Sequence, residues 1–168
     1  MSNGAANPAT FPRKINLVAD DATLMGLALE QAAAAADRGD PGFGAVVARE
    51  GEAVAAAGST EVTTCDPLAH DGLTVLGQTC RRLGRARLPD CTYYGTAEPC
   101  PMCSAALLQT QIHRVVIAAS GADLAGLLGR RAIHLEDLRA DYDHQILIER
   151  GLRHDEGLKV LARSLRPR

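Results

Sequence analysis

The sequence has no tryptophan, and aromatic residues make up only 3% of its 168 residues. Proteins that bind single-stranded nucleic acid stack bases on aromatic side chains, so this scarcity argues against such a surface. A basic excess is also missing, because the formal net charge is −2. Strong non-specific binding to a phosphate backbone is therefore not expected, and nucleic acid is not a predicted partner. One small basic cluster is interpreted as a solvated helix end: Arg81, Arg82, Arg85 and Arg87.

Long apolar runs are absent as well. No stretch approaches the roughly 18 residues that a membrane span needs, and the opening residues, MSNGAANPATFPRK, lack the apolar centre of a signal peptide. The cysteines number five, an odd count. In a reducing compartment a close cysteine pair binds metal or takes part in catalysis more often than it forms a disulfide. We expect a cytoplasmic protein with no membrane partner.

Helical and strand patterns alternate along the chain. Residues 1–19 show little periodicity and are predicted to be a flexible N-terminal arm, followed by one domain over residues 20–168. Helices are expected at 20–36, 66–84, 99–111, 141–151 and 155–165, and strands at 43–50, 52–62, 91–97, 113–119 and 131–137. Asp66 is the expected N-cap of the second helix, with Pro67 at its first position. The alternation predicts an α/β layered sheet.

A histidine and a Cys-x-x-Cys pair form the strongest chemical signal. Cys100 and Cys103 enter a predicted helix, where the helix dipole favours deprotonated sulfur. His70 falls in the first turns of another predicted helix. Three protein ligands with an open fourth position are typical of a catalytic zinc site, whereas a structural site is closed by four. We therefore predict Zn²⁺ held by His70, Cys100 and Cys103.

The residues around these ligands resemble a known family. The segments FGAVV (43–47), DPLAH (66–70) and EPCPMC (98–103) are similar to those of the cytidine deaminase superfamily, in particular its guanine deaminase and tRNA adenosine deaminase branch. The resemblance implies a three-layer α/β/α sandwich with a central five-stranded mixed sheet. It also implies zinc, removal of an exocyclic amine from a nucleobase-like ring, and a homodimer or higher homo-oligomer. The predicted substrate contacts are Phe43, Ala45, Thr60, Asp71 and Ala97.

Two motifs depart from the family pattern. Relatives read His-Ala-Glu where this chain has His70-Asp71-Gly72. The missing glutamate moves protons between water, ring and leaving amine, and such catalysis contributes about 10²–10⁴-fold. Relatives also read Gly-His-Asn-Arg-Val where this chain has GSTEV at residues 58–62. Thr60 cannot offer the paired donor and acceptor of an amide, so a changed substrate is expected.

Asp71 is the predicted replacement for the missing carboxylate. Positions 71 and 72 face directions about 100° apart on a helix, and aspartate is one methylene shorter than glutamate. The other reading of Asp71 is a carboxylate placed in a first helical turn by the helix dipole. Glu61, Glu98 or a group from the C-terminal segment are alternative proton carriers, although both glutamates also read as surface or scaffold residues.

Three functions remain open from the sequence. The first is a zinc-dependent hydrolase of the deaminase type, acting on a nucleobase-like or other small nitrogen heterocycle with altered proton-transfer groups. The second is a non-catalytic member of the fold that pairs with a partner or binds a ligand. The third is another reaction assisted by zinc as a Lewis acid, such as hydration, ring opening or cyclisation.

Overall fold

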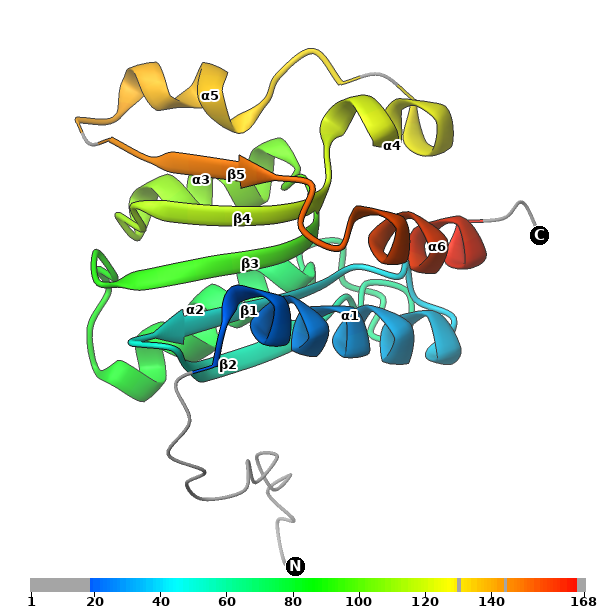
Figure 1. Cartoon of the computed structure of the whole chain (residues 1–168), viewed down its shortest axis with the longest axis horizontal. Coiled ribbons are helices and arrows are strands. Elements are labelled where there is room, and N and C mark those ends of the chain that lie inside the picture. The colour runs from blue at the N-terminus through cyan, green and yellow to red at the C-terminus, as the bar shows by residue number, and fades with distance from the viewer. Residues whose placement is uncertain (1–18, 130, 144, 166–168) are drawn as a thin grey trace, which may run out of the picture.

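The structure is a computed structural model that describes residues 19–129, 131–143 and 145–165 (Figure 1). The predicted N-terminal arm, residues 1–19, lies outside the described residues except for Ala19. The helices are α1 (Asp21–Arg38), α2 (Asp71–Leu83), α3 (Pro101–Gln109), α4 (Gly121–Leu128), α5 (Leu135–Leu138), the 3₁₀ turn η1 (Arg139–Asp141) and α6 (His154–Ser164). The strands are β1 (Gly44–Arg49), β2 (Glu52–Gly58), β3 (Cys91–Ala97), β4 (Arg114–Ala119) and β5 (Leu147–Arg150).

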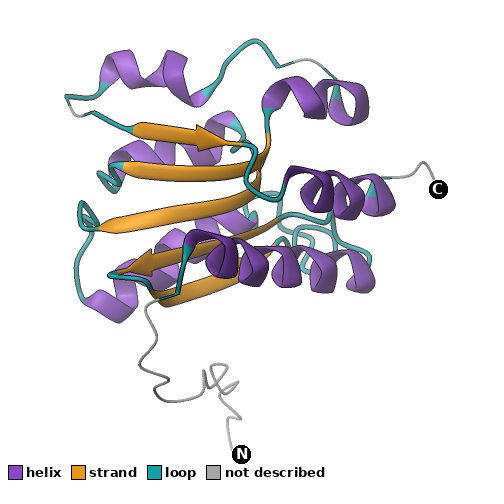
Figure 2. Ribbon diagram, in the orientation of Figure 1, coloured by secondary structure: helices purple, strands orange, loops and turns teal. Residues whose placement is uncertain are grey.

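The five strands form one mixed sheet in the order β2-β1-β3-β4-β5. Strand β1 runs antiparallel to both β2 and β3, whereas β3, β4 and β5 run parallel to one another. Helices α1 and α6 pack on one face of the sheet, and α2 and α3 cover the other (Figure 2). This arrangement confirms the predicted α/β/α sandwich with a five-stranded mixed sheet.

Each face of the sheet has its own hydrophobic core, because successive strand residues point to opposite faces. In β3, Tyr93 belongs to the core under α2 and α3, whereas Tyr94 belongs to the core under α1. The Tyr94 hydroxyl donates a 2.7 Å hydrogen bond to Asp21 at the start of α1. The two neighbouring tyrosines therefore lie in unrelated environments.

The segment before α2 differs from the prediction. The helix begins at Asp71 with His70 as its N-cap, so the expected start at Asp66 is wrong. Residues 61–70 form turns instead, and the Asp66 carboxylate accepts the backbone N–H of Leu68 at 2.9 Å. A short aspartate side chain that bonds the backbone two residues on is typical of a turn, and this local bond competes with an N-cap.

The C-terminal third contains two further differences. Residues 131–137, expected as a strand, include most of the one-turn helix α5, and residues 141–151, expected as a helix, contain strand β5. The run ILIE at 146–149 is too short for periodicity to separate helix from strand. Pairing decides it, because Leu147–Arg150 lies in parallel register with 114–117 of β4 and completes the sheet. None of the helices that the structure describes has the length and apolar character of a membrane span.

Candidate metal centre and pocket

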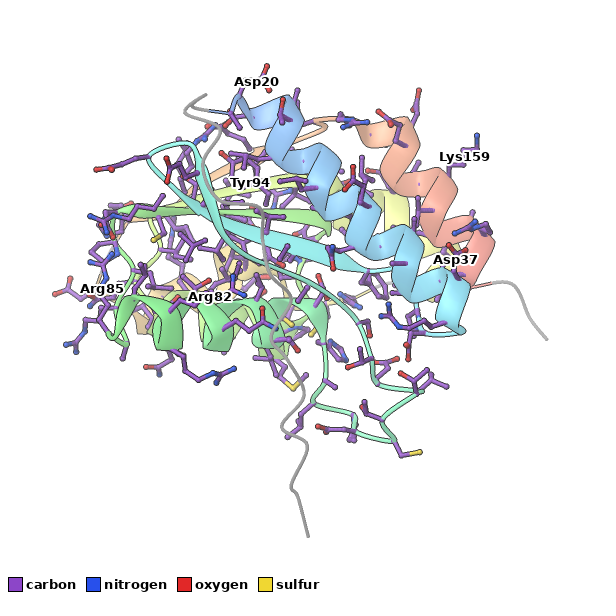
Figure 3. The ribbon with its side chains drawn as sticks, turned by 90° about the horizontal axis from the view of Figure 1, so that it is seen from below. Asp20, Asp37, Arg82, Arg85, Tyr94 and Lys159 are labelled. Atoms are coloured by element: carbon purple, nitrogen blue, oxygen red, sulfur yellow. The ribbon has the colours of Figure 1, made fainter. Side chains whose placement is uncertain are left out.

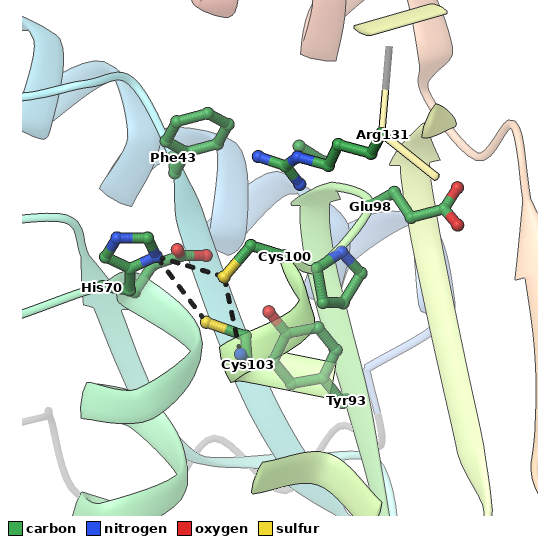
Figure 4. A pocket seen from close by; sticks show the side chains of 10 residues that line it. Phe43, His70, Tyr93, Glu98, Cys100, Cys103 and Arg131 are labelled. Carbon is green, nitrogen blue, oxygen red and sulfur yellow. Dashed lines mark hydrogen bonds between the residues drawn. The ribbon is translucent and has the colours of Figure 1, made fainter. Parts of the chain in front are cut away.

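Three potential metal ligands converge where α2 and α3 begin. His70 is the N-cap of α2, Cys100 is the N-cap of α3, and Cys103 lies in the first turn of α3. His70 Nδ1 is 3.5 Å from Cys100 Sγ and 3.8 Å from Cys103 Sγ (Figure 4). The polar atoms of all three side chains lie within 4.8 Å of one another. The predicted ligand set is thus brought together by two helix N-termini.

The spacing of these atoms fits tetrahedral zinc. With bonds of about 2.3 Å to sulfur and about 2.0–2.1 Å to nitrogen, two ligands of one tetrahedron lie roughly 3.6–3.8 Å apart. The measured separations of 3.5 and 3.8 Å agree with that geometry. One imidazole nitrogen and two thiolates are also a donor set that zinc prefers. The residues therefore fit the predicted metal and leave a fourth position open.

Glu61 contacts the outer side of the histidine ligand. Its Oε2 lies 2.9 Å from His70 Nε2, the ring nitrogen that faces away from the two sulfurs. Ligating histidines commonly donate their second N–H to a carboxylate, which fixes the tautomer and the ring orientation. Glu61 belongs to the GSTEV segment that departs from the family pattern. Its position here assigns it to holding His70, a role that the sequence reading did not include.

The pKa values of the two cysteine thiols are shifted in opposite directions. Hydrogen bonding from Cys103, reinforced by His70 and opposed by burial, holds the pKa of the Cys100 thiol well below its ordinary value. Hydrogen bonding to Cys100 and burial raise the pKa of the Cys103 thiol. The backbone N–H of Cys103 also points at Cys100 Sγ across 3.5 Å, as expected at a helix N-terminus. Negative charge therefore gathers on Cys100, where a cation would sit.

A pocket of about 330 Å³, part of it open to solvent, lies beside the ligands. Its lining residues are Phe43, His70, Asp71, Tyr93, Ala97, Glu98, Pro99, Cys100, Cys103 and Arg131. Phe43, Asp71 and Ala97 are thus placed in the pocket, as expected for substrate contacts. Ala45 is fully buried in the core under α2, and Thr60 donates its N–H to Ala69 in the 61–70 turn region. Substrate contact by these two residues stays a prediction.

Asp71 and Glu98 have different environments. Burial raises the pKa of Asp71 to about 6, and backbone N–H groups at the start of α2 oppose that shift. Glu98 is 6% exposed and accepts hydrogen bonds from Arg150 and from the Gly121 N–H. Burial raises the pKa of Glu98, but these donors and His134 outweigh it and hold the pKa below its ordinary value. Glu98 is fully engaged as scaffold, whereas Asp71 faces the pocket.

Position 72 is closed to a side chain as the chain is folded. A Cβ atom there would lie 2.9 Å from Cys103 Sγ and 3.3 Å from Tyr93 Oη. The sequence places Tyr93 and Arg131 only within predicted strands, at residues 91–97 and 131–137. Both line the pocket. Tyr93 and Gly95 are alternate residues of β3, so they face the same side of the sheet. This alternation was the sequence signal that could have placed Tyr93 near the ligands.

The chain matches a described protein family over residues 18–119, the "Cytidine and deoxycytidylate deaminase zinc-binding region". The tRNA-specific adenosine deaminase of Bacillus subtilis is 32% identical over 136 residues, covering 81% of this chain and 83% of that protein. The chain therefore belongs to the cytidine and deoxycytidylate deaminase family. This finding confirms the superfamily suggested by the three motifs.

Other relatives agree with the predicted branch. The guanine deaminase of Bacillus subtilis is 42% identical over 84 residues, covering 49% of this chain and 53% of that protein. A solved structure from studies of A-to-I editing by tRNA:A34 deaminases has a TM-score of 0.73 and 29% identity, covering 83% of this chain and 99% of its own. The match with the tRNA-specific adenosine deaminase of Aquifex aeolicus spans 62% of that protein. Relatives of this chain thus include both guanine and tRNA adenosine deaminases.

Proposed function

We propose that this chain is a zinc-dependent hydrolase that removes an exocyclic amine from a small amino-substituted nitrogen heterocycle. The observation that carries the proposal is the three-ligand arrangement of His70, Cys100 and Cys103, which opens onto a pocket that also contains Asp71. Zinc at such a site would lower the pKa of a bound water to about 7 and supply a nucleophile at neutral pH.

Asp71 is the proposed proton carrier of the pocket. It follows His70 directly and is brought to the same cavity as the two cysteines. Its carboxylate would take one proton from the attacking water as the C–O bond forms and pass it to the amine nitrogen as the C–N bond breaks, while the second proton of that water ends on the adjacent ring nitrogen. Ammonia and the carbonyl form of the ring are then the products. Glu98 does not compete for this role, because it accepts hydrogen bonds from Arg150 and Gly121. Gly72 cannot compete, because it has no side chain.

A free heterocycle is the proposed substrate, even though some relatives act on tRNA. The basic cluster lies at the end of α2, where Arg82 and Arg85 are seen in Figure 3. A helix rises 1.5 Å per residue, so this end is about 18 Å from the metal ligands at its start. Arg82 donates to the Val54 carbonyl and Arg85 pairs with Asp90. Arg131 is the only basic residue besides His70 among the pocket-lining residues that the structure describes, and it would face an anionic or carbonyl group of a bound ring.

Ammonia release from a panel of aminopurines, aminopyrimidines and aminopteridines tests the proposal. The native chain, loaded with zinc, is compared with Cys103→Ala, which removes a ligand, and with Cys80→Ala, which removes a half-buried cysteine further along α2. Zinc-dependent ammonia release by the native chain and Cys80→Ala, lost in Cys103→Ala, supports the proposal. Hydrated or ring-opened products without ammonia would favour a different zinc-assisted reaction. Bound zinc with no product from any compound would favour a non-catalytic member of the fold.

A further inference from the structure

The hydroxyl of Tyr93 is a buried polar group that faces the pocket. Tyr93 is 1% exposed, and no hydrogen bond to its hydroxyl is found within the described part of the chain. Among the described residues, Ser59 Oγ is the fully enclosed side-chain oxygen without a partner, so the Tyr93 hydroxyl keeps its small exposure toward the pocket. Its side chain lines the pocket and directs the hydroxyl toward Cys100 and Cys103 (Figure 4). Buried tyrosine hydroxyls usually have a partner, because an unpaired polar group away from water is costly. The position of this hydroxyl points to a partner inside the pocket.

Two glycines provide the space that the Tyr93 ring occupies. A Cβ at Gly95 would lie 2.8 Å from Tyr93 Cε1 and 3.2 Å from Tyr93 Oη, which is too close for a side chain to be accommodated. A Cβ at Gly72 would lie 3.3 Å from the same oxygen. The Tyr93 hydroxyl therefore borders the point from which a side chain at position 72 would start. The Tyr93 side chain therefore fits at this place only because positions 72 and 95 are both glycine.

We propose that the Tyr93 hydroxyl positions the molecule or group held at the open fourth ligand position, from beside the space that a side chain at position 72 would enter. It approaches the metal ligands from β3, whereas a residue at 72 would approach them from α2. A neutral phenol is a hydrogen-bond donor, so it would donate to the molecule or group held at the open position beside Cys103. Tyr93 is in this sense a positioning residue, and Asp71 keeps the proton-carrying role. Any effect of this hydrogen bond on catalysis rests on the proposed function, whereas the hydrogen bond itself does not.

Zinc affinity tests this hydrogen bond without any need for a substrate. Tyr93→Phe removes only the hydroxyl, and Tyr94→Phe is the matched control, because Tyr94 bonds to Asp21 on the opposite face of the sheet. We expect Tyr93→Phe to raise the zinc dissociation constant about tenfold, as is typical when a group that supports a metal site is lost. Tyr94→Phe should leave that constant unchanged.

Thermal unfolding of the chelated protein separates this role from simple packing. Without metal, Tyr93→Phe should be about as stable as the native chain, since no hydrogen bond joins this hydroxyl to another described residue. With zinc, the gain in melting temperature should be smaller in Tyr93→Phe than in the native chain. An unchanged zinc affinity in Tyr93→Phe, or an equal loss of stability with and without zinc, would overturn the proposal.

Gly95→Ala supplies a second, independent variant. A methyl group at 95 would displace the Tyr93 ring, so zinc affinity should fall although residue 95 is not a ligand. In the Tyr93→Phe background the same change should lower zinc affinity less, because no hydroxyl remains to be displaced, although the methyl group still meets the ring carbon Cε1 and the Ala97 carbonyl. Equal losses in the two backgrounds would contradict the proposal. A failure of the deaminase proposal would appear as missing ammonia release and would leave these metal-binding results intact.

Discussion

Replacing Glu61 with glutamine should weaken zinc binding without removing a ligand. The carboxylate lies 2.9 Å from His70 Nε2, and the two side chains are 30% and 28% exposed. A hydrogen bond to a charged group contributes about 1.5–3 kcal/mol, and partial exposure places this one at the lower end. A loss of about 1.4 kcal/mol corresponds to a tenfold weaker zinc complex, which agrees with the usual effect of losing such a carboxylate.

Competition with a chromophoric chelator at neutral pH measures this change directly. Glu156→Gln is the control, because Glu156 is exposed and pairs with Arg153 at the start of α6, outside the pocket. We expect a tenfold higher zinc dissociation constant for Glu61→Gln and the native value for Glu156→Gln. If Glu61→Gln binds zinc as tightly as the native chain, the carboxylate does not support His70, and the reasoning from the 2.9 Å contact is refuted.

Three further predictions concern stability. Chelation should lower the melting temperature by about 5–10 °C, because zinc at 100 times its dissociation constant stabilises by about 2.7 kcal/mol; an unchanged value would argue against a bound metal. Gly72→Glu should destabilise by about 2 kcal/mol in thermal unfolding, since its Cβ meets Cys103 and Tyr93, and a gain in stability would contradict this. Hydrogen bonds from Arg114 and Tyr94 lower the pKa of Asp21 to about 2, below the unfolded value. Their stabilisation is therefore complete above about pH 4 and is lost as the pH falls toward 2. Because the Asp21 side chain is 42% exposed, Asp21→Asn should lose only about 1 kcal/mol at neutral pH and nothing near pH 2 in denaturant titrations, and an equal loss at both would contradict the assignment.

The metal ligands could be predicted from the sequence because their chemistry is local. Cys100 and Cys103 share one helical turn, and the surrounding family motif identified His70 as the third ligand. The alternation of helices and strands likewise predicted the layered sheet. Signals of this kind depend on residues close in sequence or on a motif of fixed form, so they need no knowledge of tertiary packing.

Features that depend on packing were not predictable in the same way. The run at 146–149 carries no decisive period, and only pairing with β4 makes Leu147–Arg150 a strand. Glu61 and Tyr93 reach the site from a turn region and from β3, 9 and 7 residues from the nearest ligand in sequence, and only the folded chain brings them to it. The closed space at position 72 depends on Tyr93 and Cys103, which lie on different elements. These relations exist only in three dimensions.

The carboxylate of Glu98 has a consequence for recombining this chain with its relatives. Four segments meet at it: the strand end before Cys100, the N-terminus of α4 through Gly121, His134 before α5, and Arg150 of β5. A hybrid protein that joins residues up to 120 to the tail of another family member must bring partners for this buried acid. Without an equivalent of Arg150, the hybrid would leave the buried Glu98 carboxylate without its arginine partner, two residues before the metal ligand Cys100. The crossover point for such hybrids therefore has to lie before residue 98 or after residue 150.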